Sequence, residues 1–212
     1  MARIVIVDYG MGNLPSVRNA LRTVGFDAVV SEDPAAVAGA DALVLPGVGA
    51  FGAGMRNLAR RGLDRAVRQA AAAGRPVLGI CLGMQLMFAE GEEGGLRPGL
   101  GLLEGRVTRL PGGLPLPQIG WNLVEPRQDH PVFAGLPASF WAYFDHSYAV
   151  EGEPPGAALA MTEYGRAYPS VVGRGNLLGI QFHPEKSSRV GLRMLENWGK
   201  MVCGLSSSRP ST

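Results

Sequence analysis

Residues 76–85 read Pro-Val-Leu-Gly-Ile-Cys-Leu-Gly-Met-Gln, an apolar run that ends in Gly-x-Cys-x-Gly and leads into a second apolar stretch up to residue 88. This order is typical of a nucleophile elbow, in which a strand, a sharp turn carrying the nucleophile and a helix follow one another. Gly79 and Gly83 suit such a turn, because residues without a Cβ relieve the crowding of neighbouring backbone. The pattern predicts Cys81 at a helix N-terminus, where free N–H groups and the helix dipole favour a thiolate.

The alternative interpretation of Cys81 is a buried, unreactive thiol, which is the commoner fate of a lone cysteine. The two flanking glycines favour a nucleophile, and a base elsewhere in the chain would decide the matter. Cys203 is distant in sequence, and neither cysteine belongs to a Cys-x-x-Cys or Cys/His cluster. We therefore expect no disulfide framework, no metal site and no cofactor.

The composition favours a folded α/β protein that works in the cytoplasm. Hydrophobic residues make up 46% of the 212 residues and charged residues 18%, which supports a sizeable core and argues against general disorder. The net charge of +2 indicates neither nucleic acid nor an anionic membrane as a partner. No apolar run approaches the roughly 20 residues that span a bilayer, and free thiols suit a reducing compartment.

The first half of the chain alternates short apolar runs with helical periodicity. Such alternation predicts an open, mostly parallel twisted sheet with helices on both faces, whose sites lie at the carboxyl ends of the strands. Asp8, Pro46 and Cys81 fall at such ends. The strands are expected at residues 4–7, 28–30, 42–45 and 76–80, with one helix over 17–24 and one long helix over 55–71.

Residues 91–160 differ, because turn signals recur too often for long helices. They predict hairpins that form an antiparallel β extension, with strand-like pieces at 106–110 and 140–148. A further strand is expected at 177–182 and a final helix over 190–202. We expect one domain over residues 1–205 and a disordered polar tail from residue 206 to 212.

The chain has three histidines that could serve Cys81 as a base. His130 precedes a proline in a turn-rich segment and is expected in a loop, and His146 lies in an aromatic stretch where a structural role competes with a catalytic one. His183 begins His183-Pro184-Glu185, and the proline biases it toward extended backbone. Because residues i and i+2 of an extended chain point the same way, Glu185 could orient His183. The residues therefore favour a Cys81–His183–Glu185 triad.

The motifs around Cys81 and His183 together resemble the signature pair of the class I glutamine amidotransferases. The resemblance rests on Gly79-Ile80-Cys81-Leu82-Gly83-Met84-Gln85 and Gln181-Phe182-His183-Pro184-Glu185. Three further stretches resemble one member of this family: residues 8–13, 46–51 and 119–122. The resemblance runs from Ile4 to about Cys203, nearly the whole chain, and it is specific because five separated motifs agree in order.

The resemblance implies hydrolysis of glutamine to glutamate and ammonia through a γ-glutamyl thioester. Cys81 would be the nucleophile, His183 the general acid and base, and Glu185 its orienting partner. Backbone N–H groups of Leu82 and of the segment Gly47-Val48-Gly49 would hold the oxyanion. In the family this segment is associated with a hole that forms fully only in the active state, although a simple tight turn would explain its glycines equally well.

The resemblance also assigns substrate and partner contacts. Glutamine would be bound by Gln85, Glu93 and backbone near Ser147 and Tyr148, although Gln85 could be an exposed helix residue and Glu93 a solvated charge. A separate synthase subunit, a (β/α)₈ barrel, would form a heterodimer with this chain and consume the ammonia. Asp145 stands where the family usually has an apolar residue. The residues expected at the interface are Asn13, Trp121, Tyr143 and Lys186.

Three other functions fit parts of the pattern. The chain could be the glutaminase of another amidotransferase, such as anthranilate synthase, but residues 8–13 and 120–122 argue against this. It could be an inactive binding module of the same fold, but all three triad residues are present. It could be a stand-alone γ-glutamyl hydrolase or a cysteine peptidase of similar fold, since one fold hosts many functions.

Overall fold

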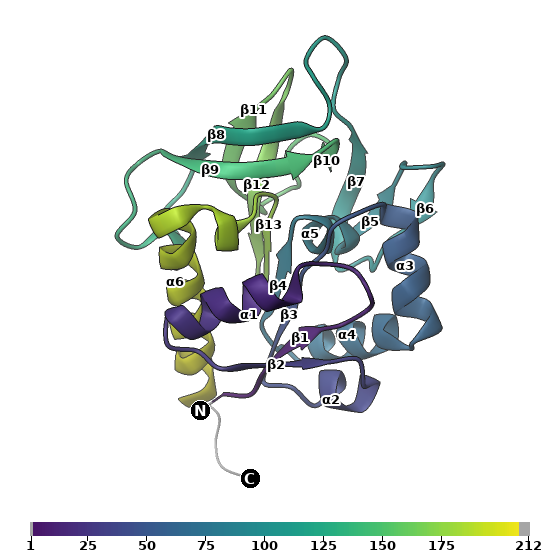
Figure 1. Ribbon diagram of the computed structural model, residues 1–212, viewed down its shortest axis with the longest axis vertical. Helices are drawn as coiled ribbons and strands as arrows, with labels where there is room; N and C mark the ends of the chain where they lie inside the picture. Colours follow the sequence, from purple (N-terminus) through teal and green to yellow (C-terminus); the bar gives the residue numbers. More distant parts are fainter. Residues whose placement is uncertain (1, 208–212) are drawn as a thin grey trace.

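The computed structural model describes residues 2–207, and its centre is a nine-stranded sheet with the strand order β2-β1-β3-β4-β13-β12-β11-β8-β9 (Figure 1). The five strands from β2 to β13 are parallel, and the remaining four continue the sheet in antiparallel fashion. This arrangement confirms the predicted mixed sheet. The strands are β1 Ile4–Val7, β2 Ala28–Ser31, β3 Ala42–Leu45, β4 Val77–Ile80, β8 Gln118–Pro126, β9 Phe140–His146, β11 Ala158–Glu163, β12 Ala167–Arg174 and β13 Leu177–Ile180.

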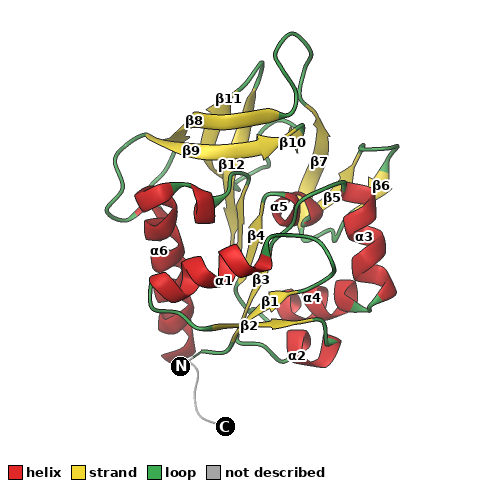
Figure 2. Ribbon diagram, in the orientation of Figure 1, coloured by secondary structure: helices red, strands yellow, loops and turns green. Residues whose placement is uncertain are grey.

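A smaller sheet lies beside the carboxyl end of β4, with the order β10-β7-β5-β6. Its strands are β5 Phe88–Gly91, β6 Arg97–Pro98, β7 Leu103–Arg109 and β10 Tyr148–Val150. Most of the helices gather around the parallel half of the main sheet, while the antiparallel half consists of strands and loops (Figure 2). The expected antiparallel extension is therefore present.

The helices cover both faces of the parallel strands, and each face has its own hydrophobic core. Ile4 and Ile6 of β1 pack with α1 and α6, whereas Val5 and Val7 pack with α2, α3 and α4. This alternation explains why β1 is apolar at every position, as strands buried on both faces are. The helices are α1 Leu14–Thr23, α2 Pro34–Ala38, α3 Phe51–Arg60, α4 Leu63–Ala72, α5 Leu82–Leu86 and α6 Ser188–Ser207, with 3₁₀ turns η1 Pro131–Phe133 and η2 Pro184–Lys186.

The long helix expected over residues 55–71 is wrong, because the structure has two helices there. Helix α3 ends at Arg60 and α4 begins at Leu63. Gly62 between them has a φ of 68°, a left-handed conformation that a helix cannot contain. The apolar periodicity runs through both helices, since both pack on the same face of the sheet.

Two further elements differ from expectation. Helix α2 was not predicted, although Asp33 caps it by accepting a hydrogen bond from the N–H of Ala35 at 3.0 Å. Helix α6 continues to Ser207, so residues 206 and 207 belong to it, and the rest of the expected tail lies outside the described residues. Within residues 2–207, no helix is long and apolar enough to cross a membrane.

Candidate active site

Cys81 occupies the sharp turn between β4 and α5, with φ 53° and ψ −112°. The two glycines around it are sterically required. A Cβ on Gly83 would lie 1.7 Å from the carbonyl oxygen of Leu45, and one on Gly79 would lie 2.7 Å from the backbone nitrogen of Met84. Both clashes involve backbone, which cannot move aside. The sequence-based prediction of a strand, turn and helix around Cys81 is confirmed.

His183 reaches Cys81 because it follows β13, the parallel neighbour of β4. The backbone N–H of Cys81 donates to the carbonyl of Ile180 at 2.8 Å, which fixes the two strand ends side by side. His183 Nδ1 lies 2.8 Å from Glu185 Oε1, and both side chains are buried. The two residues meet through the 3₁₀ turn η2 rather than through the continuous extended backbone expected. Ser187 fixes that turn by donating to the carbonyl of His183 at 2.6 Å.

The electrostatics of the site favour a protonated His183. Burial by itself lowers the pKa of His183, but its interactions with Cys81 and Glu185 outweigh burial and raise the pKa to about 10. Because Nδ1 is engaged with Glu185, Nε2 is the nitrogen left for Cys81, and it is buried without a hydrogen-bond partner. The arrangement can hold an imidazolium beside a thiolate and deliver its proton to a leaving group.

The sulfur of Cys81 faces a cavity of about 290 Å³. Gln181 Nε2 lies 3.9 Å from Sγ, and the carbonyl oxygen of Asp145 lies 3.8 Å from it. Gln181 was quoted in the sequence analysis within a motif but was given no role. Its position two residues before His183 could have indicated that its side chain points toward the same site. The lining residues are Val48, Gly49, Ala50, Cys81, Leu82, Gln85, Glu93, Pro117, Asp145, His146, Ser147 and Tyr148.

The four residues expected to bind glutamine, Gln85, Glu93, Ser147 and Tyr148, all line this cavity. Gln85 is buried rather than exposed, and its Nε2 donates to the carbonyl of Tyr148 at 2.7 Å and to Gln181 Oε1 at 3.1 Å. Glu93 is partly buried, and its Oε2 accepts a hydrogen bond from the N–H of Phe51 at 2.7 Å. Gln85 is therefore not an exposed helix residue, and one oxygen of Glu93 is bound to the N-terminus of α3 rather than left to solvent.

One of the backbone donors expected to hold an oxyanion, the N–H of Leu82, is already engaged in this conformation. The N–H of Leu82 donates to the carbonyl of Gly47 at 3.3 Å. Val48 and Gly49 line the cavity beside Cys81, and Gly49 has a φ of 106°. The carbonyl of Gly47 therefore occupies the donor that a negatively charged oxygen would need.

The other two histidines have structural surroundings. His146 is buried, its Nδ1 lies 2.9 Å from the carbonyl of Tyr148, and its Nε2 lies 3.3 Å from the hydroxyl of Tyr168. Burial lowers the pKa of His146 to about 4, which keeps it neutral at pH 7. His130 caps η1, where its Nδ1 accepts from the N–H of Val132 at 3.2 Å.

Three of the four expected interface residues form one cluster on the outer face of β8 and β9. The rings of Trp121 and Tyr143 meet edge to face at 6.2 Å, and Lys186 Nζ lies 5.5 Å from the Tyr143 ring. Trp121 is 51% exposed, so a large apolar surface faces outward. Asn13 stands apart from these contacts and caps α1 through its side chain. Asp145, paired with Ile119, lies on the same face as Trp121 and Tyr143.

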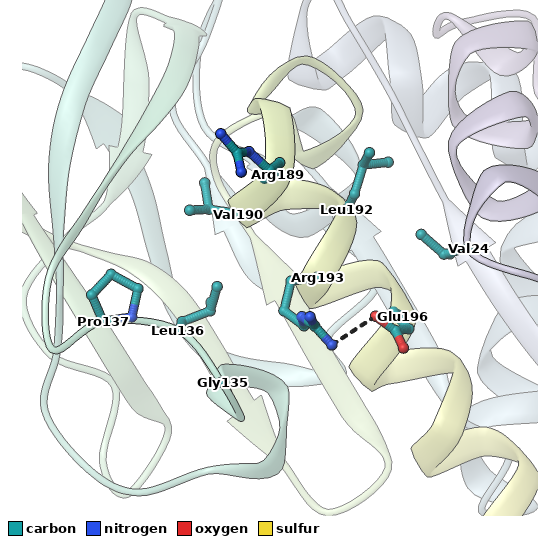
Figure 3. Close-up of a pocket in the computed structure, with 9 residues that line it drawn as sticks. All are labelled: Val24, Gly135, Leu136, Pro137, Arg189, Val190, Leu192, Arg193 and Glu196. Carbon is teal, nitrogen blue, oxygen red and sulfur yellow. Dashed lines mark hydrogen bonds and ion pairs between the residues drawn. The ribbon is translucent and has the colours of Figure 1, made fainter.

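A larger cavity of about 430 Å³ lies between α6 and the loop at residues 135–137 (Figure 3). Its charged side chains are Arg189, Arg193 and Glu196, of which the last two pair at 3.0 Å. None of the triad residues lines it. Of the three candidate catalytic residues, Cys81 lines the smaller cavity instead.

Comparison with known proteins agrees with this geometry. The family described as glutamine amidotransferase class-I matches residues 5–201. Imidazole glycerol phosphate synthase subunit HisH of Symbiobacterium thermophilum is 85% identical over 212 residues and covers 100% of both chains. The chain belongs to the HisH family of class-I glutamine amidotransferases. The resemblance found in the sequence is thereby confirmed.

Other members of the HisH family and other solved amidotransferase structures extend the comparison. The HisH subunit of Moorella thermoacetica is 48% identical over 202 residues, which is 95% of this chain and 96% of its own. A solved glutamine amidotransferase has a TM-score of 0.73 at 26% identity and covers 92% of this chain and 98% of its own. PurLQS from Thermotoga maritima, at 16% identity, shares the fold with a TM-score of 0.71 over 97% of this chain and 100% of its own.

Proposed function

We propose that this chain is the glutaminase subunit of imidazole glycerol phosphate synthase. It hydrolyses glutamine to glutamate and ammonia, and a (β/α)₈-barrel synthase subunit uses the ammonia to make imidazole glycerol phosphate and an aminoimidazole carboxamide ribotide in histidine biosynthesis. The observation that carries the proposal is the buried His183, held by Glu185 on one nitrogen and left with the other for Cys81 at the cavity. Free thiols suit a cytoplasmic setting.

The first half of the reaction forms the thioester. Cys81 Sγ attacks the side-chain amide carbon of glutamine, and the carbonyl π electrons move onto oxygen. When the tetrahedral intermediate collapses, the C–N bond breaks and His183 Nε2 gives its proton to the leaving nitrogen, which departs as ammonia. Glu185 keeps the proton of Nδ1 in place and stabilises the imidazolium before transfer.

The second half releases glutamate. His183, now neutral, takes a proton from water as the water oxygen attacks the thioester carbon. The C–S bond breaks, the electron pair returns to sulfur, and the thiolate–imidazolium pair is restored. Because one histidine acts as acid and then as base, the mechanism needs no second titratable group.

The oxyanion of both intermediates requires a rearrangement of residues 47–49. We propose that the Gly47–Val48 peptide turns over, so that the carbonyl of Gly47 releases the N–H of Leu82 and the N–H of Val48 points at the reacting oxygen. The absence of side chains at Gly47 and Gly49 makes such a turn sterically possible. The hydrogen bond between the N–H of Leu82 and the carbonyl of Gly47 supports the proposal that the site is inactive until this peptide turns over.

Glutamine binding uses the same cavity. Hydrogen bonds fix the side chains of two residues before the substrate arrives. Gln85 is held by Tyr148 and Gln181, and Glu93 is held by the N–H of Phe51. The partially free carboxylate of Glu93 suits an α-ammonium group, and backbone at Ser147 and Tyr148 lines the opposite side. The substrate would therefore lie with its amide at Cys81 and its charged end toward these residues.

The synthase subunit would dock on the outer face of β8 and β9. Trp121, Tyr143 and Lys186 form one exposed aromatic and cationic cluster there, a composition typical of interface anchors. Asn13 would belong to the rim of the same contact. The carboxylate of Asp145 on this face is a local departure that affects the interface and leaves the triad unchanged.

A glutaminase assay with and without the synthase subunit and its nucleotide ligand tests the proposal. We expect turnover of glutamine that depends on both, and that is abolished in Cys81→Ala. Full activity of the chain alone would instead favour a γ-glutamyl hydrolase. Retention of activity in Cys81→Ala within the complex would refute the mechanism.

A further inference from the structure

The hydroxyl of Tyr9 touches the backbone that is expected to rearrange. Tyr9 follows β1 and is fully buried, and its hydroxyl donates to the carbonyl of Pro46 at 2.7 Å. Burial raises the pKa of Tyr9 well above its usual range, so the hydroxyl keeps its proton and acts as a donor. Pro46 immediately precedes the Gly47–Val48 peptide.

The contact depends on the glycine at position 47. A Cβ there would lie 2.1 Å from the Tyr9 hydroxyl and 3.0 Å from the Cβ of Leu82. Gly47 therefore fits between Tyr9 on one side and the nucleophile turn on the other. A side chain at Gly47 would expel the hydroxyl that holds Pro46.

The turn that carries Tyr9 lies along the same segment. A Cβ on Gly12 would lie 3.5 Å from the Cα of Gly47, and one on Gly49 would lie 2.7 Å from the Met11 side chain. Residues 9–12 therefore form the wall behind residues 46–49. Of these contacts, the Tyr9 hydroxyl makes the hydrogen bond to the segment itself.

We propose that Tyr9 is a positioning residue for the oxyanion hole, an inference that rests on the proposed function. By holding the carbonyl of Pro46, Tyr9 fixes the Pro46–Gly47 peptide as a pivot, so that only the next peptide turns. The N–H of Val48 then arrives at one defined place beside Cys81. Without the Tyr9 hydroxyl, residues 46–49 can rotate together, and the N–H of Val48 no longer points at the substrate oxyanion. An oxyanion hole stabilises the transition state only when its donors are correctly placed.

Tyr9→Phe in the full complex with synthase subunit and nucleotide ligand tests the inference. We expect kcat for glutamine hydrolysis to fall by about tenfold or more, with KM within about twofold of wild type, because the interaction lost acts mainly in the transition state. Alkylation of Cys81 by iodoacetamide needs no oxyanion hole, so its rate should remain within about twofold.

Tyr168→Phe is the matched control. Tyr168 is also fully buried, and the hydroxyl that it loses donates to Gln118 at 2.9 Å and lies 3.3 Å from His146 Nε2 rather than bonding to the carbonyl of Pro46. We expect this variant to lower the melting temperature as Tyr9→Phe does while retaining kcat. Equal losses of kcat in both variants, or a Tyr9→Phe kcat within about threefold of wild type, would overturn the inference.

Two comparisons keep the test decisive. If Tyr9→Phe does not fold, 4-aminophenylalanine and 4-methylphenylalanine at position 9 fill the hydroxyl's space, and only the amino variant, a donor, should retain kcat. Equal kcat in these two would overturn the inference. A wild-type complex without glutaminase activity would refute the proposed function, whereas an active wild type with an unaffected Tyr9→Phe refutes only the role of Tyr9.

Discussion

The N–H of Leu82 is bonded to the carbonyl of Gly47 at 3.3 Å, directly beside the sulfur of Cys81. One donor that the oxyanion requires is therefore satisfied by the protein itself, while His183 and Glu185 are already paired. In this conformation the proposed base already has its orienting partner, whereas the proposed oxyanion hole is not yet formed. Reactivity of Cys81 and turnover of glutamine should therefore be separable.

The first prediction concerns this separation. In a Cys203→Ser background, which removes the exposed second thiol, the chain alone should be alkylated by iodoacetamide at Cys81 nearly as fast as in the complex. Glutamine turnover by the same samples should differ by about 100-fold or more, the usual effect of an oxyanion donor. Parallel changes in the two rates would show that activation acts on the thiol rather than on the hole.

The second prediction concerns pH. His183 has a folded-state pKa raised from 6.5 to about 10, so its charge contributes stability that is complete below about pH 6.5 and is lost as the pH rises toward 10. For one proton the loss is at most about 1.4 kcal/mol per pH unit. Glu185→Gln removes one of the interactions that raise the pKa of His183. The unfolding free energy of this variant should therefore fall less steeply than that of wild type between about pH 6.5 and 10.

Urea unfolding at several pH values checks that prediction. Glu196→Gln is the control, because Glu196 is a carboxylate in ion pairs with Arg193 and Lys200 on α6, away from the site. The unfolding free energy of Glu196→Gln should change with pH as steeply as that of wild type. An unchanged slope in Glu185→Gln would mean that Glu185 does not hold the proton of His183.

The sequence predicted the parts of the site that depend on residue type and strand order. The two glycines around Cys81 could be assigned from the sequence because a sharp turn has no room for their side chains. The carboxylate two residues after His183 could be assigned because a catalytic histidine needs a partner that fixes its tautomer. The pairing of Cys81 with His183 was predicted from the chemistry of a Cys–His–Glu triad and from the family resemblance, whereas the structure shows that both residues follow neighbouring parallel strands, β4 and β13.

The rest could not be predicted because it depends on tertiary contacts. The break at Gly62 is invisible in a periodicity that continues through α3 and α4. The bonds of Gln85 to Gln181 and Tyr148, and of Tyr9 to Pro46, join residues 37 or more positions apart. No local pattern specifies which carbonyl a buried donor will reach.

The third prediction concerns the tight nucleophile turn. Gly83→Ala should destabilise the chain by about 3 kcal/mol or prevent folding, because its Cβ would meet the backbone carbonyl of Leu45, which cannot yield. Gly112→Ala is the control, since a Cβ there meets nothing within 4 Å. Thermal unfolding of both variants measures the difference. Equal melting temperatures would contradict the close packing of α5 on β3.

The fourth prediction concerns the docking face. Trp121→Ala should weaken binding of the synthase subunit by about 30-fold, the effect of losing a central aromatic anchor worth about 2 kcal/mol. Trp121 packs on Tyr143, and Lys186 lies over the Tyr143 ring, so the truncation removes the exposed aromatic side chain at one end of the cluster. Val29→Ala provides the comparison, because Val29 is 58% exposed on β2, at the opposite edge of the sheet, and should leave the Kd unchanged. Isothermal titration of the two subunits measures both values.

The kinetics of the complex provide a second control. When the synthase subunit is saturating, the glutaminase KM of Trp121→Ala should match that of wild type, since Trp121 does not line the cavity at Cys81. A wild-type Kd for Trp121→Ala would exclude this face as the centre of the interface.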